Sequence, residues 1–239
     1  MNFAFYISGK SGRLFKFLKQ IDKNTIGEIK IVISDYALEE RLAELIKACG
    51  IESVIYDYKD LCSETIMKKN RELSDKMLAC LKKYKIDYCF SFGSHILSGD
   101  LLQEYKNKLI NFHPAILPMY PGRNAIDQAV DQGNTFLIGN TAHFIDSGID
   151  TGIVIMQSVI PLQAFFPEHD YDAILDLQIE MLIKLISILK GNRLELRNNR
   201  CLIKDADYSV HHIYPEIAIF ENIPPLDNIV VDNTGKGGG

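Results

Sequence analysis

Asn111 and His113 stand two residues apart in the stretch INFHPAILPMYPG, at the end of an apolar run that is typical of a β-strand. Side chains two apart on a strand share a face, so both can direct a hydrogen-bond donor at one point if the imidazole is protonated. Two such donors make an oxyanion hole, which stabilises the tetrahedral intermediate of an acyl transfer. Pro114, Pro118 and Pro121 follow and predict a stiff loop beneath the pair.

A charged imidazole needs a third group to hold it, and an aspartate in a nearby turn can do so. The turn DSGIDTG offers Asp146 and Asp150. The alternative is a structural role, in which Asn111 and His113 are two polar groups bonded within the protein at a strand end. The Asn-x-His pair taken by itself favours that structural role.

The elements before this stretch alternate between short apolar runs and amphipathic segments. The predicted strands cover residues 3–9, 28–34, 51–58, 86–93 and 108–113. The predicted helices cover residues 13–21, 37–50, 64–84 and 99–107. Nearly continuous apolar strands that alternate with helices indicate a parallel sheet covered on both faces.

The pattern changes after the proline-rich loop. A helix is predicted over residues 123–133, then two strands over 136–146 and 152–160 joined by the turn SGIDTG, and a long helix over 171–191. Such a strand pair favours a hairpin, which makes the sheet mixed. We therefore expect an α/β fold with a doubly wound, mostly parallel sheet of Rossmann-like type over residues 1–191. Residues 192–239 are expected to form a small C-terminal extension of short strands or an irregular arm with a flexible end.

Charge and composition exclude several classes of function. The chain has 239 residues and a net charge of −5, with no concentrated basic region, so a nucleic-acid partner is not expected. No apolar run reaches the roughly 18 residues of a membrane span, and the N-terminus lacks the features of a secretory leader. Five cysteines without a CxxC pair suit free thiols, so we expect a cytoplasmic protein. His211 and His212 lack a third ligand, and no metal is expected.

The stretch NFHPAILPMYPG, followed by AHFIDSGIDTGIVIMQ, resembles the formyltransferases that use 10-formyltetrahydrofolate. Among them the likeness is greatest to glycinamide ribonucleotide transformylases, over roughly residues 1–190. The resemblance implies that Asn111, His113 and Asp150 are catalytic, and it makes Asp146 a loop-shaping residue. The co-substrate is then 10-formyltetrahydrofolate, with no metal. His143 is either an auxiliary site residue or a structural histidine.

Folate-binding residues follow from the same resemblance. The segment FGSHIL corresponds to a strand end whose backbone binds the pterin ring, and the loop before Asp150 should close over that ring. The folate-site residues are thus Ser94, His95, Ile96, Leu97, Ser147, Gly148 and Ile149. For the acceptor we expect Gly9, Lys10, Ser11, Gly12, Arg13 and Pro114, because ligands of a doubly wound sheet bind beyond the carboxyl ends of its strands.

The loop after the first strand departs from the pattern of the purine enzymes. Those enzymes carry Gly-x-Gly-Ser-Asn, which holds a substrate phosphate, whereas this chain has Gly9-Lys10-Ser11-Gly12-Arg13. The departure favours a different phosphate-bearing small-molecule amine, the amino group of a nucleotide-linked sugar. Two alternatives stay open: formylation of glycinamide ribonucleotide, and hydrolysis by a formyltetrahydrofolate deformylase. The sequence leaves the assembly open, including a homodimer.

Overall fold

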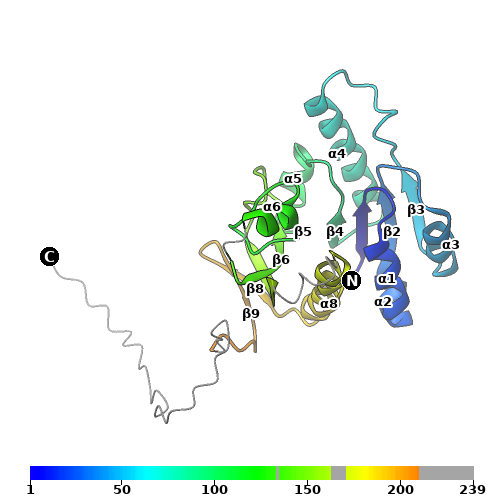
Figure 1. The fold of residues 1–239 in the computed structure, drawn as a ribbon. Helices are drawn as coiled ribbons and strands as arrows, with labels where there is room; N and C mark the ends of the chain where they lie inside the picture. The colour runs from blue at the N-terminus through cyan, green and yellow to red at the C-terminus, as the bar shows by residue number, and fades with distance from the viewer. Residues whose placement is uncertain (133–134, 163–170, 210–239) are drawn as a thin grey trace, which may run out of the picture. The chain divides into compact units, whose positions relative to one another are not determined.

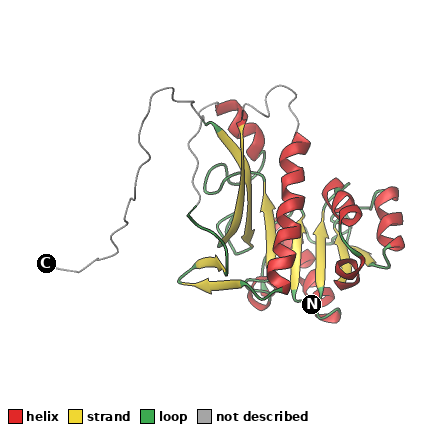
Figure 2. Cartoon of the chain, turned by 90° about the horizontal axis from the view of Figure 1, so that it is seen from below, coloured by secondary structure: helices red, strands yellow, loops and turns green. Residues whose placement is uncertain are grey.

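The computed structural model describes residues 1–132, 135–162 and 171–209, which contain a seven-stranded sheet and a two-stranded sheet. The large sheet has the strand order β3-β2-β1-β4-β5-β6-β7 (Figures 1 and 2). Its first five strands are parallel: β1 (Phe3–Ile7), β2 (Ile29–Ser34), β3 (Glu52–Ile55), β4 (Tyr88–Phe92) and β5 (Leu109–His113). Strands β6 (Leu137–Phe144) and β7 (Val154–Pro161) run antiparallel beyond β5.

Helices cover both faces of this sheet (Figure 1). One face packs on α1 (Gly12–Gln20), α3 (Glu40–Ala48) and α8 (Tyr171–Lys190), and the other on α4 (Ile66–Lys83) and α5 (Asp100–Glu104). Two short helices, α2 (Lys23–Glu28) and α6 (Ala125–Gln132), complete the described helices. The α/β, doubly wound and mostly parallel fold predicted from the sequence is confirmed, including the hairpin that makes the sheet mixed.

Local sequence explains where these elements begin and end. Strand β1 is buried along its whole length, which is why it shows an unbroken apolar run and no alternation. Helix α4 begins after Thr65, whose side chain accepts from the amide of Lys68. Gly50 follows α3 with a φ of +70°, a conformation that glycine adopts without steric cost. Helix α2 was not predicted, and it depends on the cap that Asp22 provides.

Contacts divide the chain into two compact units, Met1–Ala206 and Asp207–Gly239. The hairpin of β8 (Leu194–Arg197) and β9 (Arg200–Ile203) belongs to the first unit, where β9 contacts β7. The predicted boundary after residue 191 stays a prediction. His211, His212 and the rest of the expected flexible end lie outside the described residues.

None of the helices in residues 1–132, 135–162 and 171–209 has the length and apolar composition to cross a bilayer. Over those same ranges, no group of three histidine, cysteine, aspartate or glutamate side chains is arranged to hold a metal ion.

Candidate active site

Strands β5 and β6 bring three polar side chains to one face of the sheet. Asn111 and His113 alternate with Phe112, which belongs to the core on the opposite face. In the antiparallel pairing with β6, Asn111 lies opposite His143. His113 is 4% exposed and His143 is 2% exposed, so both imidazoles are buried and need partners within the protein.

His113 contacts an acceptor with each ring nitrogen. Its Nε2 lies 2.7 Å from the carbonyl oxygen of Tyr120, and because a carbonyl can only accept, Nε2 carries a hydrogen. Its Nδ1 lies 3.3 Å from Oδ2 of Asp150. Two acceptors around one imidazole suit the doubly protonated, positively charged ring that an oxyanion hole requires.

Asp150 joins the histidines to the proline-rich loop. Its Oδ2 accepts from the amide of Gly122 at 2.8 Å, and its Oδ1 lies 3.4 Å from Nε2 of His143. Burial works to raise the pKa of Asp150, but the hydrogen bond with His143, the Gly122 amide and the nearby imidazoles lower the pKa below its ordinary value. The structure therefore favours an ionised carboxylate beside His113.

His143 contacts two of the predicted catalytic residues. Its Nδ1 donates to the carbonyl of Phe144 at 2.9 Å, which fixes the ring, and its Nε2 lies 3.2 Å from the amide nitrogen of Asn111. The sequence left His143 between an auxiliary and a structural role. The structure gives it a fixed orientation and direct contact with Asn111 and Asp150.

Two polar residues that the sequence analysis missed, the buried Thr141 and the exposed Gln157, anchor the proline-rich loop. The hydroxyl of Thr141 donates to the carbonyl of Ala115 at 2.7 Å and accepts from the amide of Leu117 at 3.0 Å. The amide of Gln157 donates to the carbonyl of Leu117 at 2.9 Å. The signal was a threonine and a glutamine that face each other across the predicted hairpin. Their bonds fix the loop that follows His113.

The predicted folate segment after β4 is partly exposed. Ser94 and Ile96 face solvent, with Ile96 53% exposed, whereas Leu97 is 4% exposed and joins an apolar cluster that Ile145 also packs against. His95 turns its Nδ1 towards Oδ2 of Asp35, at 2.7 Å. Leu97 thus anchors this segment in the apolar cluster that Ile145 also packs against.

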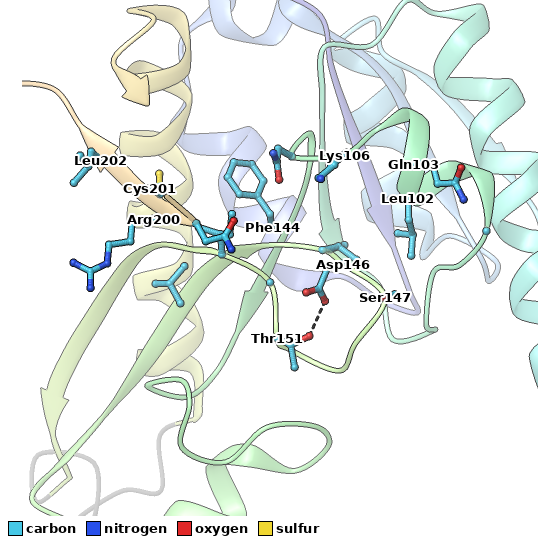
Figure 3. A pocket seen from close by; sticks show the side chains of 17 residues that line it. Leu102, Gln103, Lys106, Phe144, Asp146, Ser147, Thr151, Arg200, Cys201 and Leu202 are labelled. Carbon is cyan, nitrogen blue, oxygen red and sulfur yellow. Dashed lines mark hydrogen bonds between the residues drawn. The ribbon is translucent and has the colours of Figure 1, made fainter. Parts of the chain in front are cut away.

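The loop from Ser147 to Ile149 is exposed, and Ile149 is 58% exposed. Asp146 shapes this loop, since it accepts from the amide of Gly148 at 3.0 Å and from the hydroxyl of Thr151 at 2.8 Å (Figure 3). This is the position predicted for a loop-shaping acid, while Asp150 faces the histidines.

The predicted acceptor loop divides into two parts. Gly9 and Ser11 have positive φ angles of 62° and 39°, Lys10 and Gly12 are exposed, and the Ser11 hydroxyl is buried without a hydrogen-bond partner among the described residues. Ser11 precedes α1 but does not cap it with its side chain. Pro114 is half-buried directly after His113.

Arg13 does not join the rest of that loop. Its guanidinium donates to Oε1 of Gln178 at 2.5 Å and lies 4.4 Å from the centre of the Phe92 ring. Burial lowers the pKa of Arg13 to about 10. The prediction that Arg13 and Lys10 act together on an anion stays a prediction, and in this structure one nitrogen of the Arg13 guanidinium is bonded to Gln178.

A pocket of about 1050 Å³ lies against the loop after β6 (Figure 3). Helix α5, the loop after β6 and strand β9 line it, with Leu102, Lys106, Asp146 and Arg200 among the lining residues. The lining includes Ser147 of the predicted folate loop but none of the three predicted catalytic residues. The pocket therefore does not contain the predicted catalytic group.

The amino-acid sequence is similar to those of a purine biosynthetic protein and a formyltransferase. The chain is 35% identical over 164 residues to the trifunctional purine biosynthetic protein adenosine-3 of Drosophila pseudoobscura pseudoobscura. This match covers 66% of this chain but only 11% of that protein. It is 28% identical over 170 residues to the phosphoribosylglycinamide formyltransferase of Bacillus subtilis (strain 168), with 70% of this chain and 81% of that protein covered.

A solved structure agrees with the fold over most of its length. The glycinamide ribonucleotide transformylase 1 of Symbiobacterium toebii superposes with a TM-score of 0.72 and 25% identity, and the match covers 85% of this chain and 93% of that chain. The sequence model of the formyl transferase family matches residues 1–184, which include all three predicted catalytic residues. The resemblance predicted from the motifs is thereby confirmed, and the chain belongs to the formyl transferase family.

Proposed function

We propose that this protein transfers a formyl group from 10-formyltetrahydrofolate to the primary amine of glycinamide ribonucleotide. The observation that carries the proposal is the grouping of Asn111, His113 and Asp150, in which an amide and an imidazole lie beside a carboxyl group of lowered pKa. Membership of the formyl transferase family supports the reaction type. The names of the relatives support this acceptor over the nucleotide-linked amino sugar that the altered loop had favoured.

In the proposed mechanism the neutral amine attacks the formyl carbon and forms a new C–N bond. The tetrahedral intermediate carries an oxyanion, and the Asn111 amide and the His113 imidazolium donate to it. The bond from the formyl carbon to N10 then breaks, and the proton lost by the amine passes to N10, so that tetrahydrofolate leaves. Asp150 stabilises the charged imidazole throughout, because its lowered pKa keeps it ionised.

His113 has both nitrogens occupied in this structure, so one contact must open before it can donate to the oxyanion. The Tyr120 carbonyl is neutral and Asp150 is charged. Because a hydrogen bond to a charged acceptor is roughly twice as strong, the Tyr120 contact is the one we expect to exchange. Tyr120 precedes Gly122, which remains tied to Asp150, so the rest of the loop holds its place.

The segment after β4 offers backbone donors that suit the pterin ring. The amides of Ser94 and Ser98 are bonded to Ser8 and Ser74, each at 2.9 Å. The amides of Ile96 and Leu97 have no hydrogen-bond partner among the described residues. A folate bound here would meet these two donors together with the apolar side chains of Ile96 and Ile149.

The start of α1 supports a single phosphate group on the acceptor. The buried Ser11 hydroxyl lacks a partner in the described part of the chain, and no side chain caps the helix, so its first amides remain available. Helix N-termini of this kind bind phosphate. Lys10 is exposed beside them and adds positive charge. One phosphate is what glycinamide ribonucleotide carries.

A direct assay tests the proposal. The protein is incubated with 10-formyltetrahydrofolate and either glycinamide ribonucleotide, a dTDP-linked 4-amino sugar, or no amine, and tetrahydrofolate, formate and formylated product are measured. We expect formylated glycinamide ribonucleotide in equal amount to tetrahydrofolate. Faster transfer to the amino sugar would restore the earlier interpretation, and release of formate without an amine would identify a deformylase.

A further inference from the structure

A buried carboxyl group gathers hydrogen bonds at the carboxyl end of β2. Asp35 is 2% exposed, and its Oδ2 accepts from the hydroxyl of Tyr6 at 2.5 Å and from the hydroxyl of Ser8 at 2.6 Å. The third donor is Nδ1 of His95, at 2.7 Å. Burial, and then the charge of Asp35 and its hydrogen bond, raise the pKa of Tyr6 well above its ordinary value, so the phenol remains a donor.

These bonds connect Asp35 to both proposed binding loops. Ser8 directly precedes the acceptor loop, which begins at Gly9, and His95 lies in the proposed folate segment. The two loops also meet each other, because the amide of Ser94 donates to the Ser8 hydroxyl at 2.9 Å and the two serine hydroxyls lie 3.2 Å apart. One carboxyl group therefore anchors both loops.

A tyrosine clamp fixes the orientation of the His95 ring. Tyr58 stacks on it with a distance of 3.6 Å between ring centres and an angle of 17° between the planes. Tyr58 is held in turn, since its amide donates to the carbonyl of Asp35 at 2.9 Å and its hydroxyl donates to Asn70 of α4 at 2.8 Å. The His95 ring is thus fixed at Nδ1 and across one face.

We propose that Asp35 is a positioning residue shared by the two proposed loops, so that folate and acceptor are both placed by one buried carboxyl group. The inference rests on the proposed function, since it takes the loops as the binding sites for those two ligands. Transfer between two bound molecules requires the reacting atoms to be held about 3–3.5 Å apart. A common anchor fixes the separation of the two loops and therefore of the two ligands.

The test is the separate KM for each ligand in Asp35→Asn. The amide keeps the volume and one acceptor oxygen, but it loses the charge that strengthens three hydrogen bonds. We expect both KM values to rise about tenfold and kcat to fall about tenfold as well, because the two loops then no longer hold the ligands at a fixed separation. Asp57→Asn is the matched control, since it makes the same change in a neighbouring turn where the carboxylate accepts from the Lys59 amide. That variant should leave both KM values unchanged.

A variant at His95 tests the contact between Asp35 and the proposed folate segment separately. His95→Ala should raise the KM for the folate and leave the KM for the acceptor near its starting value. Because His95 acts with Asp35, the double variant Asp35→Asn/His95→Ala should raise the folate KM no further than the larger single effect. His95→Asn, whose Nδ2 stands close to the position of Nδ1, should restore most of the folate KM.

Three results would overturn the inference. These are a rise in only one KM for Asp35→Asn, independent and multiplying effects in the double variant, and no difference between His95→Ala and His95→Asn. The His95 comparison remains available if Asp35→Asn does not fold. If the native protein does not formylate glycinamide ribonucleotide, the proposed function fails. Shared positioning is then tested by calorimetric binding of tetrahydrofolate and of inorganic phosphate to the same variants.

Discussion

The carboxylate of Asp150 lies 3.3 Å from Nδ1 of His113. The two residues are distant in the sequence. They meet because His113 lies at the end of β5, and Asp150 lies in the loop that follows β6, the antiparallel neighbour of β5. The Gly122 amide holds the same carboxylate oxygen at 2.8 Å, so the loop, the acid and the imidazole form one unit. This unit is the basis of the predictions for catalysis and for pH dependence.

His113→Ala should lower kcat by at least about a hundredfold and leave folate affinity nearly unchanged, because the imidazole acts mainly on the transition state. Steady-state kinetics and equilibrium binding of tetrahydrofolate measure the two effects separately. Near-native turnover by this variant would remove His113 from the catalytic role.

Asp150→Asn should also lower kcat by about a hundredfold, since a neutral amide no longer stabilises the charged imidazole. Asp146→Asn is the comparison within the same loop. Its amide oxygen can still accept from Gly148 and Thr151, so kcat should fall by less than about threefold. Equal losses in the two variants would mean that only the shape of the loop matters.

The lowered pKa of Asp150 predicts a pH-dependent contribution to stability. A carboxyl group whose pKa is lower when folded stabilises the protein above its unfolded pKa of about 3.9, and this contribution is lost as pH falls through the folded value. The free energy of unfolding of the native protein should therefore exceed that of Asp150→Asn at about pH 5. The difference should shrink below about pH 4. Urea unfolding at several pH values measures it, and a difference that does not change with pH would contradict the assignment.

Ile96→Pro should weaken folate binding more than Ser94→Ala does. Proline removes the Ile96 amide, which has no partner among the described residues, and restricts the backbone beside it. The Ser94 side chain contacts Ser8, while its amide keeps that partner after substitution to alanine. Titration with tetrahydrofolate compares the two variants, and equal affinities would show that the pterin binds elsewhere.

Thr141→Val should destabilise the protein by about 1–3 kcal/mol, because it leaves the buried amide of Leu117 without its acceptor. Thr135→Val is the matched control. Thr135 is only half-buried and donates to the Leu137 carbonyl, so water can replace its hydroxyl and the cost should be smaller. Denaturant unfolding gives both values. A similar cost at the two positions would show that the Thr141 bonds do not anchor the loop.

Periodicity predicted the sheet, because strands and helices depend on local pattern. Spacing on a strand placed Asn111 and His113 on one face, whereas the choice of Asp150 came from the resemblance to the formyltransferases. Helix α2 escaped prediction, since six residues containing Gly27 show no apolar stripe and depend on the Asp22 cap. Arg13 was placed with Lys10 because they are neighbours in sequence. Its actual direction follows from Phe92 and Gln178, which reach it only through tertiary packing.

The same reason explains why the Asp35 anchor was not predicted. Asp35 can anchor the two loops only through its hydrogen bonds with Ser8 and His95, which are 27 and 60 residues away along the chain. Contacts of this kind depend on the order of strands in the sheet, which single-sequence periodicity does not specify.

The central claim is that the Asn111, His113 and Asp150 group transfers a formyl group to an amine. The most direct measurement is a single turnover in which excess protein meets 10-formyltetrahydrofolate labelled at the formyl carbon, with glycinamide ribonucleotide present. We expect the label to appear on the amine of glycinamide ribonucleotide as tetrahydrofolate forms. We also expect His113→Ala to slow this step by at least about a hundredfold. If the label is recovered as formate, the protein does not transfer the formyl group to this amine. If the label reaches the amine at the same rate with His113→Ala, His113 does not stabilise the oxyanion.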